Sequence, residues 1–140
     1  MKISDGRVIA DFSKSIVEDR DITMHSDGTP SRTFCYVTDA IVGYLKILTR
    51  GESGAAYNIG VSEPEITIKD LALRMIKIAK THFNYKGKLV KKSSDDRNYL
   101  TDNPQRRCPD ISKAQNELGY NPSVSLEEGL LKTLAWYYNL

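Results

Sequence analysis

Residues 26–40 read SDGTPSRTFCYVTDA, and this stretch predicts a turn, a strand and the start of a helix. It opens with a turn, because Asp and Ser side chains bond the local backbone, Gly accepts positive φ and Pro fixes its own φ. Residues 33–37 are β-branched or aromatic at most positions, which predicts a strand. Thr38 can then cap a helix, and Asp39 suits the positive end of that helix. A single arginine, Arg32, stands where the turn meets the strand, and its placement calls for an explanation.

Amphipathic segments lie on both sides of this stretch. Apolar residues recurring at helical spacing predict helices over residues 6–19, 38–49, 67–82, 112–119 and 125–137. Short apolar or β-branched runs predict strands over residues 22–24, 33–37, 56–59 and 88–91. Ser or Thr begins three of the helices, and Thr67, Ser112 and Ser125 are the expected caps. Helices that alternate with short strands predict one small α/β domain over residues 1–140.

Composition excludes several classes of partner. The 140 residues carry 20 basic and 18 acidic side chains, a net charge of +2. This balance is too weak to predict binding to nucleic acid or to an acidic membrane surface. No window approaches the roughly 20 apolar residues of a membrane span. We therefore expect a cytoplasmic protein with neither nucleic acid nor membrane as partner.

The sequence shows no familiar catalytic or metal motif. It has no GxGxxG, P-loop, GxSxG or HExxH pattern. Cys35 and Cys108 belong to no CxxC or Cys/His cluster, so we expect neither a zinc site nor a disulfide between them. His25 and His82 are isolated, which favours surface or packing roles over metal ligation.

The arginines are more informative. Residues 93–110, SSDDRNYLTDNPQRRCPD, form a long polar segment that predicts a loop, and this loop contains Arg106 and Arg107. A guanidinium presents several donors in a plane and binds phosphate in a bidentate manner. Arg32 and one of the loop arginines can therefore clamp a diphosphate. Ordinary exposed arginines are the alternative, and the residues alone leave both interpretations open.

Four segments, taken together, carry a family resemblance. They are DGRVIADF at 5–12, DGTPSRTFCYVTDA at 27–40, AYNIG at 56–60 and DNPQRRCPDISKAQNELGYNPSVSLEEGL at 102–130. In order and spacing the chain resembles the C-terminal part of extended short-chain dehydrogenases/reductases that act on nucleotide sugars. It is most similar to UDP-glucuronate decarboxylases (UDP-xylose synthases) and their dTDP-glucose 4,6-dehydratase and epimerase relatives. The resemblance implies a sugar-nucleotide-binding domain over residues 1–140, without the N-terminal Rossmann half that carries the Gly-rich NAD loop and the catalytic YxxxK pair.

The resemblance also implies a role for Arg32. It matches the family arginine that contacts the substrate diphosphate. Residues 23–32 match the loop that wraps the nucleoside, so Thr23, Met24 and His25 are expected to bind substrate. His25 differs from the large residue that relatives often carry beside the base, and this leaves the base undetermined. Asn58, in AYNIG, is expected to be a structural turn residue.

Three further arginines receive roles in the same way. Arg7 matches an arginine near the sugar-nucleotide pocket of decarboxylase-like members. Arg107 matches the arginine of an R-K-P-D segment, a proposed proton donor in one decarboxylase branch, whereas Arg106 fits the diphosphate loop of the dehydratase branch. Both assignments stay open. Pro30 and Cys108 replace a frequent Gln and Lys, which leaves the sugar undetermined as well.

Several expectations follow for the isolated chain. In the whole family enzyme NAD takes a hydride from the sugar C4 and later returns it. This chain is expected to bind a UDP- or dTDP-sugar but not NAD, and to have no decarboxylase, dehydratase or epimerase activity alone. Helices 6–19 and 38–49 are expected to expose apolar surface, which a homo-oligomer or a separate Rossmann half would cover. The alternatives are a non-catalytic binding or interaction module and a truncated product.

Overall fold

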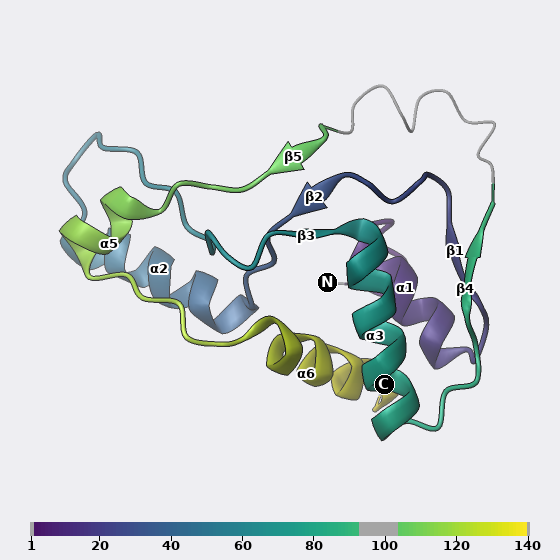
Figure 1. Cartoon of the computed structure of the whole chain (residues 1–140). Coiled ribbons are helices and arrows are strands. Elements are labelled where there is room, and N and C mark those ends of the chain that lie inside the picture. Colours follow the sequence, from purple (N-terminus) through teal and green to yellow (C-terminus); the bar gives the residue numbers. More distant parts are fainter. Residues whose placement is uncertain (1, 93–103, 140) are drawn as a thin grey trace.

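The computed structural model describes residues 2–92 and 104–139. Helices alternate with short strands along the chain, as predicted (Figure 1). The elements are α1 Val8–Val17, β1 Ile22–Met24, β2 Ser31–Arg32, α2 Val37–Arg50, β3 Ile66–Thr67, α3 Ile68–His82, β4 Leu89–Lys91, β5 Arg106–Arg107, α5 Ser112–Leu118 and α6 Leu126–Tyr138. Each predicted helix is present, with ends that move by less than one turn.

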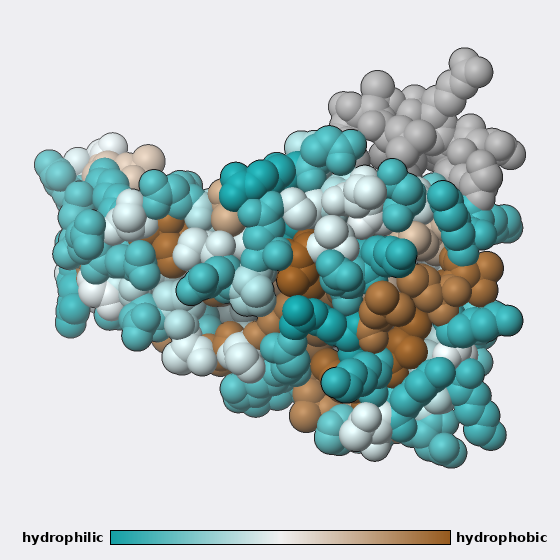
Figure 2. Space-filling view, in the orientation of Figure 1, coloured by the Kyte–Doolittle hydropathy of each residue, from teal (hydrophilic) through white to brown (hydrophobic). Residues whose placement is uncertain are grey.

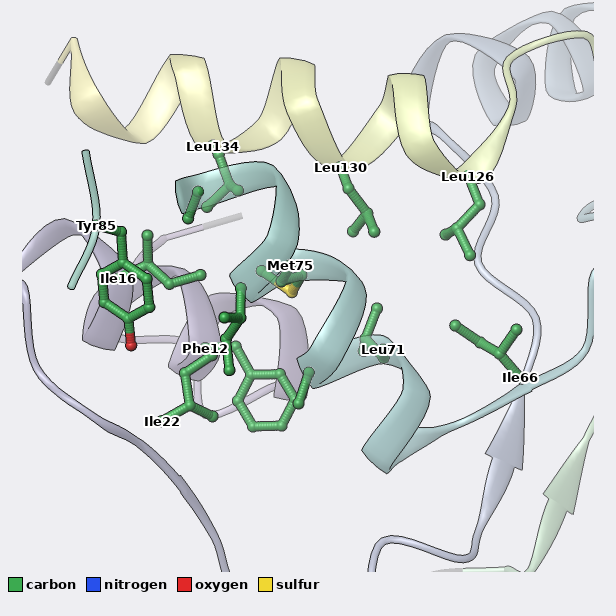
Figure 3. Packing of buried hydrophobic residues seen from close by; sticks show 13 residues of the cluster. Phe12, Ile16, Ile22, Ile66, Leu71, Met75, Tyr85, Leu126, Leu130 and Leu134 are labelled. Atoms are coloured by element: carbon green, nitrogen blue, oxygen red, sulfur yellow. The ribbon is translucent and has the colours of Figure 1, made fainter. Parts of the chain in front are cut away.

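The larger core lies where α1, α3 and α6 pack together (Figure 3). Ile16, Leu71 and Leu134 come from the three helices and are essentially inaccessible to solvent. Strand β1 adds the fully buried Ile22, and the Tyr85 hydroxyl donates to the Arg20 carbonyl at 2.7 Å. Burying side chains of this size contributes roughly 1.5–3 kcal/mol each, and this cluster holds most of the buried apolar side chains in the described residues.

Two of the three predicted caps are confirmed. The Thr67 hydroxyl accepts from the Asp70 backbone N–H at 3.0 Å, and the Ser125 hydroxyl accepts from the Glu128 N–H at 3.3 Å. The cap predicted at Ser112 is wrong. Ile111 occupies the N-cap position of α5 without a side-chain bond, and the Asp110 carboxylate instead accepts from the Ser112 N–H at 2.9 Å.

The cap predicted at Thr38 is also wrong. Helix α2 begins one residue earlier, at Val37, and Tyr36 at its N-cap makes no side-chain capping bond. Asp39 lies in the first turn as expected, but its buried carboxylate accepts from the backbone N–H groups of Ser123 and Val124 at 3.1 and 2.9 Å. This carboxylate therefore joins the start of α2 to the segment that enters α6.

The described strands form two small sheets. In one, β1 pairs with β4 in parallel, which confirms both predicted strands. In the other the order is β3-β2-β5, with β2 antiparallel to β3 and parallel to β5. Neither β3 nor β5 was predicted, because a two-residue ladder is too short to leave a periodic pattern in the sequence.

Two predicted strands are absent among the described residues. Ser31 and Arg32 pair instead of residues 33–37, since β3 and β5 each offer only two residues to the ladder. Residues 56–59 form no ladder, and Tyr57 and Ile59 pack against the smaller core around α5. β-Propensity describes fit to a pleated, half-buried surface, and here that surface is a helix rather than another strand.

Helix α2 exposes a continuous apolar face. Val37, Ile41, Tyr44, Leu45 and Leu48 are half or more exposed and recur at i, i+4, i+7, i+8 and i+11. This matches the exposed surface predicted for residues 38–49. The same prediction is wrong for residues 6–19, because α1 buries Phe12 and Ile16 in the larger core. No helix within the described ranges is long and apolar enough to cross a membrane.

Candidate functional site

A pocket of about 650 Å³ opens between the start of α1, the β3-β2-β5 sheet and the segment before Ser62. Its volume falls in the range of small-molecule sites. Val8, Ile9, Phe34 and Ile59 give it an apolar wall, and its cations are Arg7, Arg32 and Arg107. Among the described residues that line this pocket, none is Asp or Glu. The pocket is therefore suited to an anion with an apolar portion.

Arg32 and Arg107 are neighbours across the sheet. They are register partners on the parallel strands β2 and β5, and both line the pocket. Register partners project from the same face of a sheet, so the two guanidinium groups share one side. Burial, and after it the charge of Arg107, lower the pKa of Arg32. The structure thus brings together two arginines that lie far apart in the sequence.

Arg106 takes the other face of the sheet. Its guanidinium holds the Glu65 carboxylate in a bidentate ion pair, with Nη2 to Oε2 at 2.8 Å and Nε to both oxygens at 3.0 Å. Glu65 raises the pKa of Arg106, and bonds from Ser31 and Arg106 lower the pKa of Glu65. Arg106 is not among the residues that line the pocket. The register therefore separates the two loop arginines that the sequence left equivalent.

Arg7 lies at the rim of the pocket. It binds the Asp5 carboxylate through Nε at 3.0 Å and through Nη2 at 2.5 Å, and its side chain is largely exposed. The hydrogen bond from Arg7 lowers the pKa of Asp5 and raises its own. Arg7 therefore reaches the pocket as part of an ion pair rather than as an isolated cation.

Thr23, Met24 and His25 line a second, smaller pocket of about 160 Å³. This pocket shares Gly6, Val8, Ser26 and Ile68 with the larger one, so the two are contiguous. Asp11 and Ser15 of α1 also line it, and burial raises the pKa of Asp11. Sequence reasoning missed these two residues, although their i, i+4 spacing on one face of α1 was a usable signal.

The turn before β2 supports both pockets. Ser26 accepts from the Gly28 N–H at 3.2 Å, and Asp27 accepts from the Thr29 N–H at 3.0 Å, as predicted for a turn with these residues. Gly28 has φ +76°, and a Cβ there would lie 2.5 Å from the Met24 sulfur. Only glycine fits both the backbone angle and the space. The turn therefore fixes the distance between Met24 and β2.

Both cysteines are free thiols near the pocket wall. Cys35 Sγ lies 3.6 Å from the Tyr120 hydroxyl, which donates to the Gly60 carbonyl at 2.9 Å. Burial raises the pKa of Cys35. Cys108 donates to the Ser62 carbonyl at 3.2 Å. These contacts hold residues 60–62 in place. Asn58 acts similarly, since its side-chain amide donates to the Asp110 carbonyl at 2.9 Å.

The described residues offer no metal site, because no three His, Cys, Asp or Glu side chains converge there.

Comparison with known proteins gives a consistent result. Residues 1–60 match the profile of the "NAD dependent epimerase/dehydratase family". UDP-glucuronic acid decarboxylase 6 of Arabidopsis thaliana is 35% identical over 130 residues, which cover 93% of this chain and 35% of that protein. The chain is related to the NAD-dependent epimerase/dehydratase family. A mouse dTDP-D-glucose 4,6-dehydratase is 32% identical over 139 residues, covering 94% of this chain and 36% of its own length.

Solved structures of this epimerase/dehydratase family share the fold. UDP-glucose 4-epimerase from Thermotoga maritima, solved with UDP-glucose, superposes with a TM-score of 0.79 at 26% identity over 95% of this chain and 40% of that one. The match confirms that the chain has the fold of a partial domain of extended short-chain dehydrogenases/reductases. The chain spans about a third of the length of the curated relatives.

Proposed function

We propose that this chain is the sugar-nucleotide-binding portion of an NAD-dependent nucleotide-sugar decarboxylase, 4,6-dehydratase or epimerase. The observation that carries the proposal is the Arg32 and Arg107 pair, which faces a pocket whose described lining contains no carboxylate. Two planar guanidinium groups side by side suit the oxygens of a diphosphate. The relatives named above, a UDP-glucuronic acid decarboxylase, a dTDP-glucose dehydratase and a UDP-glucose epimerase, support a UDP- or dTDP-sugar as the ligand.

Different parts of the proposed ligand are assigned to the two contiguous pockets. The diphosphate lies between Arg32 and Arg107, and the nucleoside extends toward Thr23, Met24 and His25 in the smaller pocket. Arg7 at the rim is assigned to the sugar. Arg106 is already paired with Glu65, so Arg107 is favoured over Arg106 as the arginine that binds the ligand. Proton donation by Arg107 rests on the resemblance alone.

In this proposal the chemical step is carried out by the NAD-binding half of the whole enzyme. NAD supplies hydride transfer in the whole enzyme, and a UDP-glucuronic acid 4-epimerase of Bacillus cereus has been solved in complex with UDP-glucuronic acid and NAD. The present chain orients the sugar and neutralises its diphosphate. Binding energy from these remote groups serves catalysis only when the redox half is attached. The isolated chain is therefore expected to bind substrate without turning it over.

A non-catalytic interaction module is the second candidate. The exposed apolar face of α2 favours it, because a contiguous apolar surface marks an interaction site. A homo-oligomer or a separate Rossmann half would cover this face in either case. The cytoplasmic location predicted from the sequence stays a proposal.

Calorimetry with UDP and dTDP tests the proposed function. Removing a charge-assisted hydrogen-bond donor costs about 1.5–3 kcal/mol of binding free energy. Arg32→Ala should therefore weaken binding of the preferred nucleotide by roughly ten- to a hundredfold. Arg74→Ala is the matched control, since Arg74 pairs with Glu127 away from the pocket. Equal affinity of the Arg32→Ala and Arg74→Ala proteins would remove Arg32 from the site.

A further inference from the structure

The Glu65 carboxylate joins all three strands of the sheet that carries the arginine pair. Glu65 immediately precedes β3. It accepts a hydrogen bond from the Ser31 hydroxyl on β2, and it binds the Arg106 guanidinium on β5 in a bidentate manner at 2.8–3.0 Å. One side chain thus crosses the sheet.

These contacts lie behind the pocket. Side chains alternate between the two faces along a strand, so Ser31 and Arg106 project opposite to Arg32 and Arg107. Ser31 and Arg106 are themselves register partners. Glu65 therefore pairs with the arginine on the back of the sheet, opposite the face on which Arg32 and Arg107 line the pocket.

The junction between β2 and β5 needs such support. Its ladder is two residues long, flanked by bonds from the Ser31 N–H to the Gln105 carbonyl at 2.8 Å and from the Thr33 N–H to the Arg107 carbonyl at 3.2 Å. Arg32 and Arg107 lie directly across it, and like charges at opposed positions destabilise a strand pair. The repulsion between these two arginines therefore opposes the pairing of β2 with β5.

We propose that Glu65 is the positioning residue of the anion pocket. By binding Ser31 and Arg106 on the back of the sheet, it holds Arg32 and Arg107 at the spacing that grips a diphosphate. The inference rests on the proposed function, because it concerns the same pocket. Glu65 itself does not touch the ligand.

The direction in which Glu65→Gln changes UDP affinity separates a positioning role of Glu65 from a purely electrostatic one. A carboxylate near an anion pocket repels the anion, so if Glu65 acted only through its charge, Glu65→Gln would tighten UDP binding. If Glu65 holds the arginines in place, Glu65→Gln weakens UDP binding. Salt screens the first effect strongly, whereas the second acts through hydrogen bonds at contact distance and is screened less.

The experiment measures UDP affinity by calorimetry at low and high salt. Loss of the bonds that one side chain makes should weaken binding roughly three- to tenfold in Glu65→Gln. The double variant Glu65→Gln/Arg106→Gln has the net charge of the unaltered chain and should show the same loss. Glu63→Gln is the control, since it removes an equal charge from a neighbouring exposed glutamate and should not weaken binding. Affinity equal to or tighter than that of the unaltered chain, in the single or the double variant, would overturn the proposal.

Two charge-preserving variants guard against misfolding. Glu65→Asp shortens the reach of the carboxylate, and Arg106→Lys removes the bidentate fork. Positioning predicts weaker UDP binding in both while thermal unfolding stays cooperative, and unchanged affinity in both contradicts it. If the unaltered chain does not bind UDP, the proposed function fails together with this inference. If Arg32→Ala abolishes binding and the Glu65 variants do not weaken it, only the inference fails.

Discussion

The two ends of the molecule use the same kind of helix in different ways. At one end α1, α3 and α6 turn their apolar faces toward one another and share a core (Figures 1 and 3). At the other end α2 packs against α5 along one side and leaves Ile41, Leu45 and Leu48 exposed. Both helical patterns are amphipathic. Whether an apolar face is buried is decided by what lies opposite it, and the sequence of the helix does not contain that information.

At the end that contains α1, α3 and α6, the surface shown in Figure 2 carries both apolar and polar residues. In Figure 2, apolar residues on this face gather over the region of α1, α3, β1 and β4, where hydrophilic side chains interrupt them. Leu73 of α3 and Trp136 of α6 are about half exposed. Scattered apolar residues of this kind are normal on a soluble protein. The α2 face differs because its apolar residues follow one helical stripe.

Leucine truncation should give the largest difference in stability between the two ends. Leu134→Ala removes a fully buried side chain from the shared core and should lower the free energy of unfolding by about 2–5 kcal/mol. Leu48→Ala, at a position 82% exposed, should change it by less than about 0.5 kcal/mol. Urea unfolding followed by circular dichroism measures both. Equal losses would mean that the two leucines are equally buried in solution.

Self-association is expected through the α2 face. A second copy can bury the stripe of one helix against that of another, and re-burying apolar area contributes roughly 25 cal/mol per Å². Light scattering should show a mass that rises with protein concentration. Leu45→Glu/Leu48→Glu should give a monomer, while Leu73→Glu, on the other end, should not alter association.

A clean monomer at high concentration in the unaltered chain would contradict this expectation. Association retained by the α2 double variant but lost in Leu73→Glu would move the interface to the other end of the molecule. Either result would show that the α2 face is not the surface through which the chain associates.

The smallest expected effect is a pH-dependent change in Tm that arises from Glu65 in the β3-β2-β5 sheet, between the two ends. The pKa of Glu65 is lowered by its bonds to Ser31 and Arg106, so its stabilisation is present above the ordinary glutamate pKa of 4.5 and is lost as pH falls through the lower folded value. The unaltered chain should therefore have a higher Tm than Glu65→Gln at pH 6. This difference should shrink as pH falls below 4.5. A difference that is constant from pH 6 to pH 3 would show that ionisation of Glu65 does not matter.

The helices and their ends were largely predictable because their causes are local. Thr67 and Ser125 cap helices through residues three positions away, and apolar spacing marks α1, α3 and α6. The sheet at the site was not predictable in this way. β3 and β5 are two residues long and exist only because distant segments meet.

The candidate site shows the same division. Arg32 was a candidate from its own chemistry and position, the resemblance gave it a specific role, and the turn before it was predicted from its own residues. Arg106 and Arg107 could not be separated, because the register with β2 decides which of them faces the pocket. Glu65 carried no signal at all, since its partners Ser31 and Arg106 lie far from it in the sequence. Non-local pairing is the information that the sequence pattern lacks.

The parallel pairing of β2 with β5 has a consequence for how the protein is made. More than half of the chain separates Arg32 from Arg107, and the strands that carry them are direct neighbours. Contacts between residues so distant in sequence form late, because the intervening chain must first be closed into a loop. When the ribosome has synthesised β1, β2 and most of the helices, the pocket that Arg32 and Arg107 line is therefore still incomplete. The pocket arises only when the last quarter of the chain emerges and β5 is laid beside β2.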